Sequence, residues 1–194
     1  MLFDVDRDAL MNVGLVEDAV RMPGETARQY GFRGERLDFL VRVGLPNSAE
    51  YELSFGLPPE FDPGFIWDCA EEAERGWTFP AGVKKLVKIG NFPVNAVVVD
   101  PETGVVYQYT DASKEAIPVH GDLSSLAKTV ISFLGCVESY SPDDDEDDDA
   151  EYIRRKREVD ELTAGIRLVD PLPFAHEYSE WVELFDNLEG GLYF

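Results

Sequence analysis

The sequence has few cysteines, few histidines and few basic residues. It holds two cysteines, two histidines and 17 Lys or Arg residues, against 39 Asp or Glu residues. Cys69 and Cys136 fit no paired cysteine or Cys/His ligand spacing, so we expect buried thiols and neither a disulfide framework nor a zinc site. His120 and His176 each lack a second ligand at metal spacing. We therefore expect capping or surface histidines, with no metal and no cofactor.

Long apolar runs and catalytic motifs are also missing. No stretch approaches the roughly 18 apolar residues of a membrane span, and no basic or apolar leader follows Met1, so we expect a cytoplasmic protein. GxSxG, P-loop, GxGxxG and HExxH motifs are absent. Asp68, Glu71 and Glu72 are spaced as neighbours on a helix, but acids at this spacing are common on solvated helices. The sequence therefore predicts a protein that is not an enzyme.

The scarcity of basic residues gives a formal net charge of −22. Residues 1–142 hold 22 acids and 12 bases, and residues 143–151 hold eight acids and no base. A field of this sign repels nucleic acid and anionic membranes, whereas it speeds the encounter with a basic protein. We expect a basic protein partner, no direct contact with nucleic acid and no membrane binding.

One acidic run is the candidate contact region, namely Asp143, Asp144, Asp145, Glu146, Asp147, Asp148, Asp149 and Glu151. It fits no EF-hand calcium loop, because the sixth position from its start is not Gly and the twelfth is not Glu. Two interpretations stay open. The run is either a solvated linker, or a polyanion that lies on a basic cleft and copies the phosphates of a nucleic-acid substrate.

Local patterns predict a mixture of helices and strands. Apolar spacing predicts a helix over 34–43, ended by Gly-Leu-Pro, and a long helix from 122 or 124 to about 140. Three β-rich runs follow one another at 84–90, 94–100 and 104–109. The last two are joined by Asp-Pro-Glu-Thr-Gly, which predicts a tight antiparallel hairpin.

The remaining segments divide the chain into regions. We expect an α+β core at 1–142, an acidic linker or loop at 143–151, and a helical extension at 152–194 that packs on the core. A charged helix is predicted from Glu151 to Ala164, ended by Gly165, and a final helix around Trp181. Met22-Pro23-Gly24 is predicted to end whatever element precedes it.

Aromatic residues in Pro- and Gly-rich loops form a second candidate contact region. Phe65, Trp67, Trp77 and Phe92 lie in such loops. Exposed tryptophans are common binding hot spots, whereas buried ones would form a core cluster under the loops. We assign Trp67 and Trp77 to partner binding together with the acidic run, and the burial of these rings distinguishes the two interpretations.

Several motifs occur in an order that points to one family. They are the helix ending FLVRVGLP at 39–46, the strand ending at Gly90, the hairpin VVVDPETGVV at 97–106, the helix after Val119, and the closing IRLVDP at 166–171 followed by Trp181. In this order they resemble the SUKH family, in particular its fourth immunity subgroup, which is common in filamentous actinobacteria. The resemblance covers most of the chain.

The resemblance implies a single α+β domain with a mostly antiparallel sheet flanked by helices. Relatives of this kind are bacterial immunity proteins of polymorphic toxin systems, encoded beside secreted toxins that are often nucleases or nucleic-acid deaminases. They act by binding, so Gly44, Gly90 and Gly104 would hold turns and Trp181 would anchor the last helix. The alternative is a SUKH-like adaptor that docks on a cellular protein and has no toxin partner.

Overall fold

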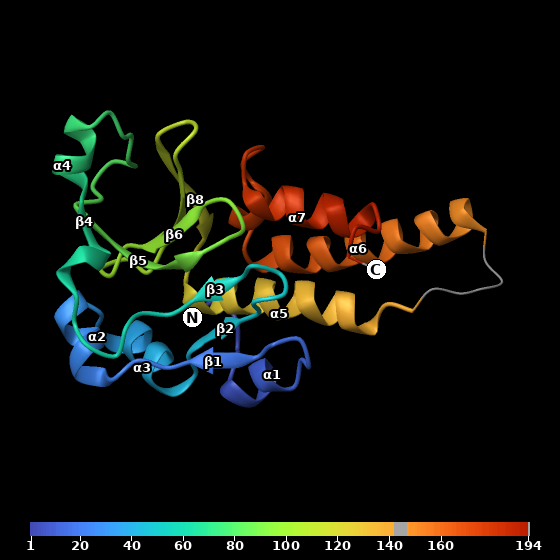
Figure 1. Cartoon of the computed structure of the whole chain (residues 1–194), viewed down its shortest axis with the longest axis horizontal. Coiled ribbons are helices and arrows are strands. Elements are labelled where there is room, and N and C mark those ends of the chain that lie inside the picture. Colours follow the sequence, from blue (N-terminus) through green and yellow to red (C-terminus); the bar gives the residue numbers. More distant parts are fainter. Residues whose placement is uncertain (142–146, 194) are drawn as a thin grey trace.

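A computed structural model describes residues 1–141 and 147–193. In chain order its elements are α1 (Arg7–Met11), β1 (Asp18–Val20), α2 (Gly24–Tyr30), α3 (Gly34–Arg42), β2 (Leu45–Asn47), β3 (Ser54–Phe55), the 3-10 helix η1 (Pro63–Phe65), β4 (Ile66–Asp68), α4 (Cys69–Glu74), β5 (Lys85–Asn91), β6 (Ala96–Val99), β7 (Val106–Thr110), β8 (Glu115–His120), α5 (Leu123–Ser139), α6 (Asp148–Val169), the 3-10 helix η2 (Leu172–Phe174) and α7 (Glu180–Glu189). They form one α+β domain with antiparallel sheets, as the sequence predicted (Figure 1).

The main sheet has the strand order β3-β5-β6-β7-β8, and β4 pairs with the part of β5 that β3 leaves free. β6 and β7 form the predicted hairpin. Asp100 closes its turn by accepting hydrogen bonds from the Glu102 N–H and the Thr103 hydroxyl, each at 2.8 Å. Gly104 has a φ of 89° there, which residues with a β-carbon rarely adopt. The turn is therefore specified by its own five residues.

Different helices and loops pack on the two faces of the main sheet. Val87 and Ile89 of β5 point into the main core beneath α5 and α7, while Leu86 points to the opposite face. That opposite face is covered in part by α4 and by residues 75–84. Val97, Val98 and Val99 of β6 are fully buried, so this inner strand is covered on both faces.

The C-terminal helices lie along α5. Figure 1 shows α5, α6 and α7 side by side, and α6 contacts both of the others. α6 begins earlier than predicted because Asp147 caps it, accepting a 2.8 Å hydrogen bond from the Ala150 N–H. The prediction that Gly165 ends this helix was wrong. Ile166 beyond it is buried in the core, and this packing outweighs the helix cost of glycine, about 1 kcal/mol.

The N-terminal part contains one helix that the sequence reading missed. The predicted break at Met22-Pro23-Gly24 is confirmed, since β1 ends at Val20. Pro23 stands immediately before the missed helix α2, where a missing backbone N–H costs nothing. Ala27 and Tyr30 of α2 are fully buried in the main core. The predicted helix at 34–43 is confirmed as α3. Within residues 1–141 and 147–193, no helix has both the length and the apolar character that crossing a bilayer requires.

Candidate partner-binding surface

A histidine, a serine and an aspartate lie together between β8, α5 and the end of α6. The His120 Nδ1 is 3.0 Å from the Ser125 hydroxyl, which donates to the Asp170 carboxylate at 2.5 Å. The His120 Nε2 accepts a 2.7 Å hydrogen bond from the Trp181 indole. The serine hydroxyl thus gives its hydrogen to the carboxylate and not to the imidazole, the reverse of an activated nucleophile. The arrangement is a structural network.

Burial supports this conclusion for the whole network. His120, Ser125 and Trp181 have 0% exposed surface and Asp170 has 2%. Burial lowers the pKa of His120 to about 3, so the ring is neutral at pH 7. The expectation of a capping or surface histidine was wrong for His120, whose ring lies in the core. Trp181 anchors α7 there, as expected.

The carboxylates near α4 do not form an acid/base pair either. Asp68 caps α4 by accepting from the backbone N–H groups of its first turn. Glu72 accepts a 3.0 Å hydrogen bond from the Tyr109 hydroxyl and pairs with Arg75, while Glu71 is exposed. Desolvation and the bond to Glu72 raise the pKa of Tyr109. In the part of the chain that the structure describes, no three His, Cys, Asp or Glu side chains are grouped to hold a metal ion.

Both predicted binding tryptophans lie on the less covered face of the main sheet. Trp77 stacks on Tyr109 of β7, with ring centroids 3.4 Å apart and planes 17° apart. Trp67 of β4 lies 4.4 Å from the same ring, and Phe79 completes the group at 6.3 Å. We call these four residues the aromatic face. Both indoles are half-buried, so each combines a packed side with an accessible one.

The other two aromatic candidates separate from this group. Phe92 is 2% exposed and contacts Phe55 and Trp181 in the main core, so the core interpretation holds for it and the hot-spot interpretation does not. Phe65 is half-buried against the same core.

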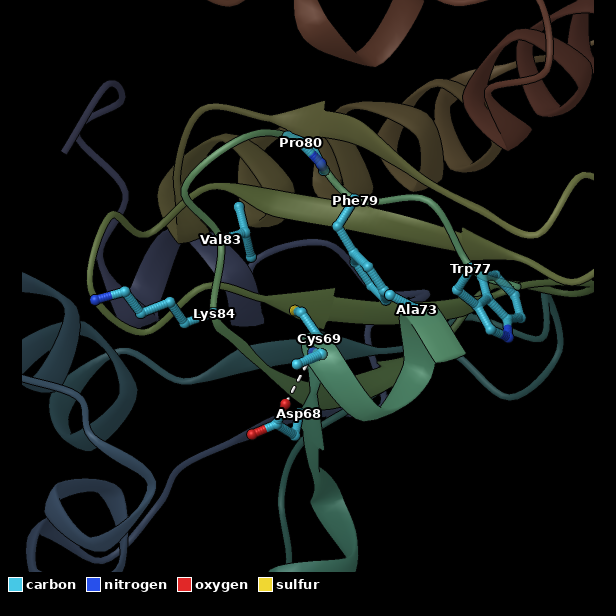
Figure 2. Close-up of a pocket in the computed structure, with 9 residues that line it drawn as sticks. Asp68, Cys69, Ala73, Trp77, Phe79, Pro80, Val83 and Lys84 are labelled. Atoms are coloured by element: carbon cyan, nitrogen blue, oxygen red, sulfur yellow. Dashed lines mark hydrogen bonds between the residues drawn. The ribbon is translucent and has the colours of Figure 1, made fainter. Parts of the chain in front are cut away.

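A pocket opens beside the aromatic face, between α4 and the loop that follows it. Its volume is about 440 Å³, and its lining residues are Asp68, Cys69, Ala70, Ala73, Trp77, Phe79, Pro80, Val83 and Lys84. Figure 2 shows the Val83 and Phe79 side chains directed toward Cys69, and the Lys84 amine directed away from them. Desolvation, helped by the charge of Asp68, raises the pKa of the Cys69 thiol to about 11, so it stays neutral. Both cysteines are free thiols; Cys69 is buried as expected, whereas Cys136 is only partly buried.

The acidic run lies partly beyond what the structure describes. Four of its members are outside the described residues, namely Asp143, Asp144, Asp145 and Glu146. Asp147 caps α6 and Asp149 is exposed. Glu151 accepts hydrogen bonds from the Tyr140 hydroxyl at 2.5 Å and from Arg155 at 2.6 Å, and these groups lower its pKa. Its carboxylate is therefore already engaged within the chain.

The described members of the acidic run lie far from the predicted binding tryptophans. In Figure 1, α4 and β4 lie at the left end of the molecule, while α6 begins at the right end. The fold thus brings Trp67 and Trp77 together, but it places them away from Asp147, Asp149 and Glu151. These are two separate surfaces, and one small contact patch cannot include both.

Comparison with known proteins relates this geometry to a family. A family model described as SUKH-4 immunity protein matches residues 5–187. This chain belongs to the SUKH-4 immunity protein family. The match extends through α6 and into α7. No curated protein and no solved structure matched the chain.

A SUKH-4 immunity protein is non-catalytic and neutralises a cognate toxin, so a toxin is the partner of this chain. The glycines among the motif residues that carried the resemblance stand at turns or at close backbone contacts in this SUKH-4 protein. Gly44 follows α3, Gly104 closes the hairpin turn, and Gly90 lies where the Ser54 backbone leaves no room for a β-carbon. The sequence reading missed Tyr109, although alternation along β7 places it on one face with Tyr107.

Proposed function

We propose that this SUKH-4 protein neutralises a basic toxin that acts on nucleic acid, as a nuclease or a nucleic-acid deaminase, in the cytoplasm where such substrates are found. The observation that carries the proposal is the formal net charge of −22 in a chain whose family binds toxins. A toxin that binds nucleic acid needs a basic cleft, and a strongly acidic partner is attracted to that cleft. Inhibition follows from occupying the cleft.

The acidic run supplies the concentrated charge in this proposal. Eight acids within residues 143–151 would lie on the toxin cleft in place of phosphates. Charges of this kind raise the association rate and the selectivity for basic partners, and salt weakens the effect. Glu151 contributes to the field through its charge, since its oxygens already accept hydrogen bonds within the chain.

Trp67 and Trp77 supply a second contact in this proposal. Their rings are held by Tyr109 on a strand of the main sheet, so little side-chain freedom is lost when a partner covers them. Half-buried tryptophans on a rigid support are favourable anchors in protein interfaces.

The test uses a candidate toxin domain whose gene lies beside the gene for this protein. We expect an equimolar amount of this protein to abolish the nuclease or deaminase activity of that domain, and to co-purify with it. Poly-glutamate at the same total charge serves as the control, and we expect it to inhibit weakly. Full toxin activity in the presence of saturating protein would refute the proposal.

A further inference from the structure

We propose that the pocket between α4 and residues 75–84 receives an apolar side chain from a segment of the toxin that also carries Lys or Arg. This inference rests on the proposed function, because the occupant belongs to the toxin. The pocket is open to the surface and, with a volume of about 440 Å³, is large enough to accommodate an aromatic or branched aliphatic side chain. α4, which supplies part of its lining, lies at the end of the molecule opposite the start of α6 (Figure 1), so the pocket defines a contact independent of Asp147 and Asp149.

The lining of the pocket is suited to an apolar occupant. Ala70, Ala73 and Val83 present methyl groups, and the raised pKa keeps the Cys69 thiol uncharged. The carboxylate of Asp68 is used in capping α4, and Figure 2 shows the Lys84 amine directed away from the pocket. A site for a polar small molecule presents converging hydrogen-bonding groups, which these lining residues do not supply. Apolar protein side chains therefore fit the site best.

One wall of the pocket is fixed before any partner binds. Trp77 stacks at 3.4 Å on Tyr109, whose hydroxyl is held by Glu72, which in turn pairs with Arg75. Tyr109 belongs to β7, an inner strand of the main sheet. A preorganised aromatic wall loses little conformational entropy on binding, which is the property of interface hot spots.

The charge around the pocket selects the residues that flank the inserted side chain. Residues 68–84, which form the cap of α4, α4 itself and the loop that follows it, hold four acids and two bases. Glu71 and Glu74 are exposed on α4, and Glu72 is the residue that pairs with Arg75. An apolar residue flanked by Lys or Arg would therefore be attracted to this site, whereas one flanked by acids would be repelled.

The test fills the pocket. Ala73 is exposed on α4 and lines the pocket, so Ala73→Phe places a ring where the toxin side chain would enter. We expect the Kd for a catalytically inactive form of the neighbouring toxin domain, measured by calorimetry, to rise at least ~tenfold. The matched control is Ala164→Phe, at an exposed alanine of α6, and we expect its Kd to equal that of the unmodified protein.

Hydrogen exchange of the unmodified protein provides a second measurement that does not depend on a variant folding. We expect the amides of residues 68–84 to gain protection when the toxin domain binds. Tight binding with no added protection at residues 68–84, or equal Kd changes in Ala73→Phe and Ala164→Phe, would overturn the pocket assignment and leave the proposed function standing. If the unmodified protein does not bind the toxin domain at all, both proposals are refuted.

Discussion

Acidification should destabilise this protein through a single buried histidine. The hydroxyl of Ser125 gives its hydrogen to Asp170, so the His120 Nδ1 must donate to that oxygen, and the His120 Nε2 accepts from Trp181. A second proton on the ring would have to enter at Nε2 and break the bond to the indole. The ring is fully buried, and its pKa is lowered to about 3.

The size and the sign of this effect follow from proton linkage. In the unfolded chain the histidine has a pKa of about 6.5. Below that pH the unfolded chain binds a proton that the folded chain does not, so the free energy of unfolding falls as the pH drops from 6.5 toward 3. With the pKa of His120 at about 3 in the folded protein, the free energy of unfolding is lower by about 2 kcal/mol at about pH 5.

Urea unfolding at pH 7 and pH 5 measures this loss. We compare the unmodified protein with His120→Gln, because an amide can donate and accept hydrogen bonds at that position without titrating. Carboxylates titrate in both proteins and cancel in the comparison. We expect the pH change to cost the unmodified protein about 2 kcal/mol more than the variant.

The matched control for this experiment is His176→Gln, at a partly exposed histidine near η2. We expect this variant to show the same pH dependence as the unmodified protein. An equal loss of stability in the unmodified protein and in His120→Gln would refute the argument that His120 is buried in its neutral form.

Two further predictions concern the core and the charge. Trp181→Phe keeps an aromatic ring but leaves the His120 Nε2 without its donor and opens a small cavity. We therefore expect the free energy of unfolding, measured in urea, to fall by about 2–4 kcal/mol. A loss below about 1 kcal/mol would contradict the role of the indole bond. Replacing the acids of 143–149 by their amides should slow toxin association about tenfold at low ionic strength and leave it unchanged near 1 M salt, by stopped-flow fluorescence. The same replacement at the exposed Asp4 and Asp8 is the control, and unchanged association for both variants would favour the linker interpretation.

Local sequence predicted the elements whose signals are complete within a few residues. The Asp100–Gly104 turn supplies its own acceptor and its own left-handed glycine, and α5 repeats apolar residues at three- and four-residue spacing. One error arose where packing against distant residues outweighs local propensity. Gly165 is a helix breaker by propensity, yet burial of Ile166 keeps α6 helical beyond it. The missed helix α2 begins directly after the break at Pro23, and burial of Tyr30 holds it in the core.

The sequence by itself determined the antiparallel hairpin, the main helix, the excess of negative charge and the family, because each depends on residue types and their order. Only the tertiary structure decided which residues meet. Trp67, Trp77 and Tyr109 come from three separate segments, and strand pairing across long stretches of chain brings them onto one face. The fold also buries His120 and places the aromatic face far from the start of α6, because neighbours in space are set by the fold and not by spacing along the chain.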